Sequence, residues 1–163
     1  MQYIRFPSGL TGFCNSKTTV EMALSGREVY LLHGELERYE PPHCPACGQK
    51  MHIHGSRITM LRHLCFGCHL STASFEKGRY RCPYCGHTEM ESIPFKADGH
   101  NITRELLRFT RDLLAYGFTN KEVSELTGLS KNTVKEIDLQ RLKGKYTADG
   151  TTLIKPEKQA RFL

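Results

Sequence analysis

The pattern of apolar positions becomes helical after residue 101. The repeating side chains fall four, seven and eleven places after the first, which puts them on one face of a helix. Gly117 follows the last of them and suits the left-handed turn that commonly ends a helix. We therefore expect an amphipathic helix that buries Ile102, Leu106, Phe109 and Leu113.

Two shorter helices are predicted after this glycine. Thr119 and Glu122 have the spacing of a capping box, in which the threonine caps the first turn and the glutamate returns to the cap amide. Gly128 is expected to end that helix, and Ser130 can cap a third one. The inward face of the third helix is expected to contain Val134, Ile137 and the aliphatic stem of Arg141.

Earlier in the chain the pattern is typical of strands. Residues 27–39 are rich in β-forming side chains and then alternate until Pro41 and Pro42 interrupt them. Residues 51–60 and 72–81 are two more β-compatible runs, separated by glycines. Residues 1–26 give no clear pattern. These runs predict a small sheet before the helices.

Two cysteine pairs flank the second and third of these runs. Cys44-Pro-Ala-Cys47-Gly and Cys82-Pro-Tyr-Cys85-Gly each have the spacing that lets one tight turn point two sulfurs at one ion. The glycine that follows each pair permits the positive φ that such a turn needs. Together the four cysteines predict one structural zinc ion, and the 34 residues between the pairs leave room for two strands and a turn. A thioredoxin-type redox pair is a poorer fit, because it would open a helix in a βαβ unit.

The remaining cysteines are harder to assign. Cys65 and Cys68 form a third pair, and several histidines nearby could complete a second metal site: His52, His54, His63 and His69. The simpler interpretation, which we adopt, is a turn that carries two thiols among ordinary polar histidines. Cys14 is a lone thiol.

Charge and hydropathy limit the classes of partner and of location that fit this chain. The net charge is +6, and segments 44–95 and 96–145 each carry an excess of three basic groups. This distribution favours a polyanionic partner, although a zinc held by four thiolates would lower it by two. The chain has neither the roughly 20 apolar residues of a membrane span nor the apolar region of a secretory signal at its start. We therefore expect a cytoplasmic protein, associated with the nucleoid when bound to DNA.

Residues 120–140 match the helix-turn-helix pattern, with small Ser124 where the helices would cross and Gly128 at the turn. The third helix would then present polar and basic side chains to a major groove. Asn132 suits a bidentate contact to adenine, whereas the lysines suit guanine edges or phosphates. A solvated bundle that binds nothing is the alternative. The candidate DNA-binding residues are Ser130, Lys131, Asn132, Thr133, Lys135, Glu136, Arg141, Lys143 and Lys145.

The order of these motifs resembles the amino-terminal part of transposases of the ISL three insertion-sequence family, over about residues 28–163. The resemblance is carried by the two zinc motifs, by the helix-turn-helix pattern and by three short segments: His54-Gly-Ser-Arg57, Leu61-Arg-His-Leu64 and Pro94-Phe95. It implies that Cys44, Cys47, Cys82 and Cys85 hold zinc, and that the chain binds the terminal inverted repeats of duplex DNA. In the family an RNase H-like domain with an acidic triad follows. Cys65 and Cys68 depart from the family pattern.

The sequence thus predicts a small α+β protein, with a zinc-ribbon-like β module followed by a three-helix helix-turn-helix domain. The expected segments are 1–42 with a strand, 43–95 with the zinc module, 96–145 with the helix-turn-helix, and a linker at 146–163 toward an absent catalytic domain. We expect DNA binding without catalysis, and leave self-association open. The alternatives are a free-standing transcriptional regulator and a zinc module for protein contacts.

Overall fold

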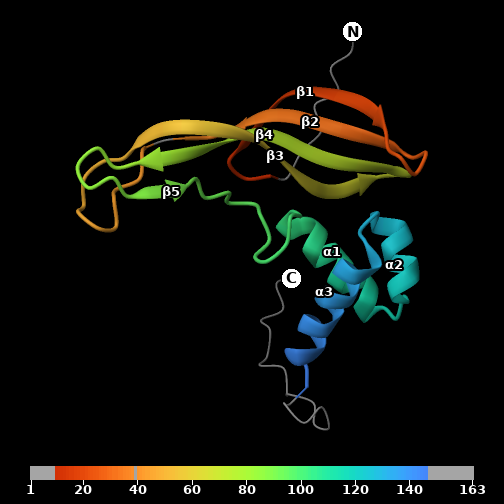
Figure 1. The fold of residues 1–163 in the computed structure, drawn as a ribbon. Helices are drawn as coiled ribbons and strands as arrows, with labels where there is room; N and C mark the ends of the chain where they lie inside the picture. Colours follow the sequence, from red (N-terminus) through yellow and green to blue (C-terminus); the bar gives the residue numbers. More distant parts are fainter. Residues whose placement is uncertain (1–9, 39, 147–163) are drawn as a thin grey trace, which may run out of the picture. The chain divides into compact units, whose positions relative to one another are not determined.

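The computed structural model describes residues 10–38 and 40–146, which form a small α+β fold with a mixed sheet and three helices (Figure 1). The chain divides after Leu106 into two compact parts, called here the sheet unit and the helical unit. The linker expected at 146–163 lies, except for its first residue, outside the described residues. The elements are β1 (Phe13–Met22), β2 (Glu28–Leu36), β3 (His52–Phe66), β4 (His69–Arg81), β5 (Thr88–Met90), α1 (Arg104–Ala115), α2 (Asn120–Thr127) and α3 (Lys131–Lys143).

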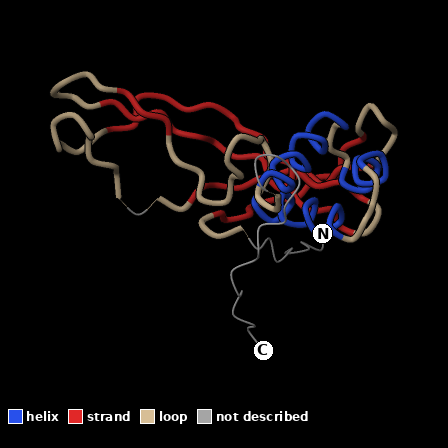
Figure 2. Tube along the Cα trace, turned by 90° about the horizontal axis from the view of Figure 1, so that it is seen from below, coloured by secondary structure: helices blue, strands red, loops and turns tan. Residues whose placement is uncertain are grey.

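The strands of the sheet unit lie in the order β1-β2-β4-β3, and β5 pairs with β4. β2 and β4 are parallel, whereas the other pairs are antiparallel. The strands extend to an end of the sheet unit that is formed by loops (Figure 2). The expected strand at 27–39 is β2, and the two short runs are parts of β3 and β4, which are longer than predicted. Residues 1–26, which gave no prediction, contribute β1.

The core of the sheet unit lies where β1, β2 and β4 meet the segment after β5. Phe13, Phe75 and Phe95 pack edge to face, with ring centroids 5.5–6.0 Å apart. This geometry is favourable for aromatic rings and adds to the burial of their apolar area. The cluster consists of Leu10, Phe13, Leu32, Leu36, Leu61, Ala73, Phe75, Ile93 and Phe95.

Gly34 allows β1 to approach β2 closely. A Cβ atom at this position would lie 2.3 Å from the carbonyl oxygen of Cys14 and 2.5 Å from the ring of Phe13. The neighbouring register of β1 shifts between Asn15 and Lys17, so the two strands come together at an irregular point of the sheet. No side chain larger than hydrogen fits there without moving the backbone.

An ion pair links the segment that follows β2 to the segment that follows β5. The guanidinium of Arg38 binds both carboxylate oxygens of Glu91, with its Nε at 2.5 Å and its second nitrogen at 2.8 Å. The backbone amide of Gly78 also donates to Glu91, at 2.6 Å. The Glu91 side chain is only 8% exposed. These contacts lower the pKa of Glu91 even though burial, the largest single influence, acts to raise it.

The helical unit forms by the local signals that the sequence predicted. Thr119 accepts from the amide of Glu122 and the glutamate side chain returns to the Thr119 amide, so the capping box is present. Gly128 ends α2 with a left-handed φ of 69°, and Ser130 caps α3. The buried side chains of this unit are Thr110, Leu114, Val123, Thr127, Leu129, Val134 and Ile137.

One prediction about α1 is wrong. Phe109 was expected on the buried face, but it is 40% exposed, whereas Thr110 is fully buried. The buried positions Ile102, Leu106, Thr110 and Leu114 are spaced by four, so the face rotates away from Phe109. The apolar pattern favoured the burial of Phe109, but in the structure the smaller Thr110 is buried instead. None of the described helices is long and apolar enough to cross a membrane.

Candidate metal centre

The two Cys-x-x-Cys loops have the same backbone hydrogen bonds. In the first loop the amide of Cys44 donates to Gln49 and that of Gly48 donates back to Cys44, both at 2.8 Å. In the second, the amide of Cys82 donates to His87 at 2.8 Å and that of Gly86 to Cys82 at 3.0 Å. Each loop is thus the same tight turn, and its glycine has the predicted positive φ, 72° at Gly48 and 74° at Gly86.

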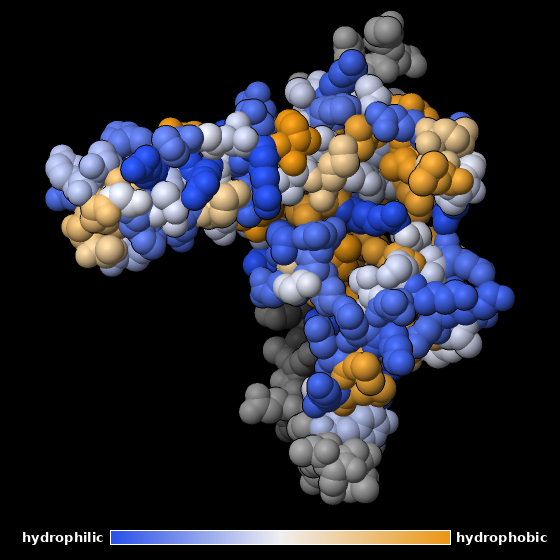
Figure 3. All heavy atoms as spheres, in the orientation of Figure 1, coloured by the Kyte–Doolittle hydropathy of each residue, from blue (hydrophilic) through white to orange (hydrophobic). Residues whose placement is uncertain are grey.

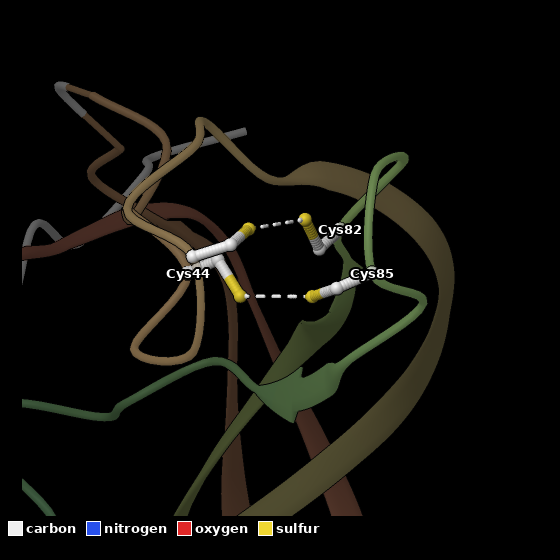
Figure 4. Close-up of side chains that lie close together, drawn as sticks. Cys44, Cys82 and Cys85 are labelled. Atoms are coloured by element: carbon white, nitrogen blue, oxygen red, sulfur yellow. Dashed lines mark hydrogen bonds between the residues drawn. The ribbon is translucent and has the colours of Figure 1, made fainter.

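These turns bring four sulfurs together at one end of the sheet (Figure 4). Their Sγ atoms all lie within 4.8 Å of one another, and the closest pairs, Cys44 with Cys85 and Cys47 with Cys82, are 3.4 Å apart. Four sulfurs bound at about 2.3 Å to a tetrahedral zinc ion lie about 3.8 Å from one another. The cluster therefore has the dimensions of a four-thiolate metal site, and the pairs are too far apart for disulfides.

Two of the four cysteines of the cluster are buried and the other two are exposed. Cys44 and Cys82, the first cysteine of each loop, are buried and pack with Met51 and Tyr80 in a small core of their own. Cys47 and Cys85 are exposed. The surface around this end is largely hydrophilic on the face drawn in Figure 3. An ion bound there would be reachable from solvent on one side only.

Without an ion, the pKa values of neighbouring thiols in the cluster shift in opposite directions. Backbone amides of Cys85 and Tyr84, together with neighbouring thiols, lower the pKa of Cys82 to about 6 in spite of its burial. The Gln49 amide favours the thiolate of Cys47, but the hydrogen bond with Cys82, burial and the other thiols raise its pKa to about 12. One sulfur therefore ionises readily at the expense of its neighbours, whereas a bound cation would stabilise all four thiolates.

The third cysteine pair lies at the opposite end of β3 and β4. Among the described residues, the four-cysteine cluster is the one group of three or more metal-binding side chains close enough to share an ion. His63 is buried and hydrogen-bonded to Thr103 at 3.0 Å, so it serves the core rather than a metal. Cys68 and His69 do contact each other, with Sγ and Nε2 3.6 Å apart.

The candidate DNA-binding side chains fall into two groups on α3 and just beyond it. Ser130 and Thr133 bond to each other at 2.8 Å and complete the helix cap, so their hydroxyls are already engaged. Arg141 is held by Asp138 at 2.7 Å. The other candidates are exposed: Lys131, Asn132, Lys135, Glu136, Lys143 and Lys145.

The comparisons with known proteins gave no relatives. No family model, no curated protein and no solved structure matches this chain. Its function must therefore be inferred from the residues themselves.

Proposed function

We propose that the four-cysteine cluster holds one zinc ion and that this ion fixes the end of the sheet. The donor set supports this assignment, because four thiolates in a tetrahedral arrangement are the typical ligands of structural zinc. All four positions are taken by protein sulfurs, which leaves none for a water or a substrate. The ion would bind to and orient the two loops rather than perform chemistry.

We infer that the helical unit binds duplex DNA, with α3 as the helix that enters the major groove. The observation that carries this proposal is the connection between α2 and α3. The left-handed Gly128 ends one helix, and Ser130 caps the next only two residues later. The hydroxyl of Ser124 donates to the Leu129 carbonyl at 2.7 Å across this turn, which stabilises its sharp bend. A two-helix unit of this kind is the one that DNA-reading proteins use.

The exposed surface of α3 has the chemistry for such a role. Its first turn presents Lys131 and Asn132 next to the helix cap, and Lys135 follows one turn later. Of the two acidic groups of α3, Asp138 is paired with Arg141 and Glu136 is exposed. Lysines in this position can bind phosphates, while a carboxamide can form two hydrogen bonds with adenine in the major groove.

We further propose that the DNA is the terminal inverted repeat of an insertion sequence and that the chain acts as the end-binding part of a transposase. This step rests on the resemblance of the motif order to that family. The chain would bind the ends in the cytoplasm, at the nucleoid, without itself cutting or joining DNA. The inverted repeats that flank the encoding element are therefore expected among the preferred sequences.

The test is a comparison of two variants of the zinc-loaded chain. Bound sequences would first be selected from a random duplex library, and affinities then measured across a salt series. The Lys143→Ala change is expected to reduce the dependence of log affinity on log salt by about 0.9, the value for one phosphate contact. Asn132→Ala is expected to relax the base preference at one position and to leave the salt slope unchanged.

A matched control is Lys17→Ala, which removes the same charge from an exposed position on β1. Its salt slope is expected to equal that of the unaltered chain. If Asn132→Ala weakens every sequence equally, that side chain contacts phosphate instead of a base. If neither α3 variant changes DNA binding, α3 is not the reading helix, and a complete lack of salt-dependent binding would favour a module for protein contacts.

A further inference from the structure

The tip of the β3–β4 hairpin brings together a thiol, an imidazole and a carboxylate. Cys68 follows Gly67 in the turn, and Phe66 pairs with His69 across it. The sulfur of Cys68 lies 3.6 Å from Nε2 of His69. On the other side of the same ring, Nδ1 lies 3.1 Å from a carboxylate oxygen of Glu28. The three groups form a chain in which each contacts the next.

Glu28 reaches this site through the parallel pairing of β2 with β4. Val29 is opposite Leu70 in that pair, so the residues that precede them, Glu28 and His69, lie side by side. The ring of His69 also packs against Tyr30, with centroids 5.1 Å apart in an edge-to-face contact. The orientation of the imidazole is therefore fixed from two directions by one strand.

The arrangement determines which nitrogen is protonated. A carboxylate only accepts hydrogen bonds, so Nδ1 of His69 must carry the proton that faces Glu28. In the neutral imidazole this leaves the lone pair of Nε2 facing the thiol of Cys68. A nucleophile next to a base, which is in turn oriented by a third group, is the general pattern of an activated nucleophile.

The other cysteines outside the metal cluster have the opposite environment. Cys14 is also exposed, but its thiol donates to Glu37 at 3.2 Å, and this hydrogen bond raises its pKa. Burial raises the pKa of Cys65, although Arg27 and Arg62 partly oppose this effect. Both surroundings favour the unreactive thiol form. By contrast, the sulfur of Cys68 faces an imidazole nitrogen, whereas the thiol of Cys14 faces a carboxylate.

We propose that Cys68 is a site of reversible covalent modification by low-molecular-weight disulfides, with His69 as its general base and Glu28 as the residue that positions the base. The exposed turn gives a small disulfide direct access to the sulfur. This role goes beyond DNA binding and does not depend on it.

The exchange involves only Cys68, His69 and the disulfide reagent. The Cys68 thiol passes its proton to Nε2 of His69 as its sulfur attacks one sulfur of the disulfide. The bond between the two sulfurs of the reagent breaks, and a new bond joins Cys68 to one of them. The departing thiolate takes the proton from the imidazolium and leaves as a thiol. Cys68 is oxidised and the departing half of the reagent is reduced.

The test uses the zinc-loaded chain, in which the metal protects the four ligand thiols, and oxidised glutathione as the probe. Peptide mass spectrometry would follow the adduct at each cysteine near pH 7. Cys68 is expected to react first, at least about tenfold faster than Cys14, which is less than the roughly 100-fold or more that a positioned general base typically supplies. Equal rates at the two exposed thiols would overturn the proposal, and this comparison needs no variant.

Variants then separate the roles of the groups. His69→Gln is expected to slow the Cys68 adduct about tenfold near neutral pH and to leave the rate at Cys14 unchanged. The rate in this variant should depend on pH more steeply than in the unaltered chain, because solvent rather than the imidazole must then take the proton of the thiol. The charged groups that face the site are Glu28 on β2 and Arg27 before it, whose guanidinium donates to the Cys68 carbonyl at 3.2 Å.

Three further variants complete the set. Glu28→Gln keeps the size of the side chain but weakens the orientation of the ring, so an intermediate rate is expected. Glu37→Gln should speed the reaction of Cys14 without affecting Cys68, because it removes the carboxylate that holds the Cys14 thiol. The distant His54→Gln, near the other end of β3, serves as the histidine control. An unchanged Cys68 rate in a zinc-loaded His69→Gln chain would refute the role of the imidazole.

Discussion

Glu91 carries a nearly buried charge in the sheet unit. Its carboxylate accepts hydrogen bonds from the Arg38 guanidinium and from the Gly78 amide, and these contacts lower its pKa. A carboxyl with a lowered pKa in the folded state contributes stability above its unfolded pKa of about 4.3. That contribution is lost as the pH falls through the folded value. The folded chain should therefore become less stable in acid.

The Glu91→Gln variant tests this contribution. It should be less stable than the unaltered chain near pH 7, by about 1–3 kcal/mol, because Arg38 loses its charged partner. The difference between the two chains should shrink as the pH falls below about 4.3, the pKa of glutamate in the unfolded chain, and should vanish below the lower pKa of the folded state. Denaturant unfolding of both chains at several pH values measures it. Since acid would release a bound metal from both chains, only the difference between them is informative, and a difference that stays constant with pH would contradict the assignment.

At the scale of elements, the two cysteine loops should tolerate no loss of a sulfur. Cys44→Ser and Cys82→Ser each remove a buried member of the cluster and should abolish binding of the single zinc ion. Cys65→Ser and Cys68→Ser are the matched controls, because these thiols lie at the far end of the same hairpin. Native mass spectrometry of the four variants checks the expectation. Two zinc ions per chain, one of which disappears in a control variant, would show a second site.

The capping box of α2 gives a second prediction at this scale. Thr119→Ala removes the hydroxyl that accepts from the Glu122 amide and should cost the helical unit about 1 kcal/mol. For a unit of this size the melting temperature should fall by about 4–8 °C. The exposed Lys121→Ala, in the same turn, is the control and should stay within about 0.5 kcal/mol. Equal melting of both variants would mean that the cap does not stabilise the unit.

How far the sequence predicts the structure depends on the kind of element. Capping residues and the Gly128 turn could be predicted because each signal and the structure it forms lie within four residues. The same is true of each cysteine loop. That the two loops meet also followed, since a shared ion explains both spacings. Local chemistry was therefore a sufficient guide.

The parts that could not be predicted depend on pairing between distant residues. β1 has no distinct alternation, and its place in the sheet is set by its register with β2. The parallel pairing of β2 with β4 brings Glu28 to His69 across 41 positions of sequence, which no spacing rule could indicate. The pairing of Arg38 with Glu91 has the same origin. Register is decided by the whole sheet, so it cannot be read from one strand.

At the scale of the molecule, the two units should respond differently to removal of the metal. Each has a core of its own residues, and the cysteine cluster belongs to the sheet unit alone. A chelator should withdraw about 10 kcal/mol of binding energy from that unit and disorder it. The helical unit should keep its structure. Amide NMR spectra before and after chelation distinguish the two sets of residues, and simultaneous loss of both would contradict independent folding.

The close approach at Gly34 also has a consequence for descent. A carbonyl oxygen occupies the place of a Cβ atom there, so every substitution has to displace the backbone of β1. Exposed positions of the same strands can drift over time, but this one cannot change while the sheet is kept. Distant homologues that have lost all other likeness to β1 and β2 should still have a glycine about ten residues before the first cysteine loop. We expect this glycine and the two Cys-Pro-x-Cys-Gly loops to be shared by relatives of this chain.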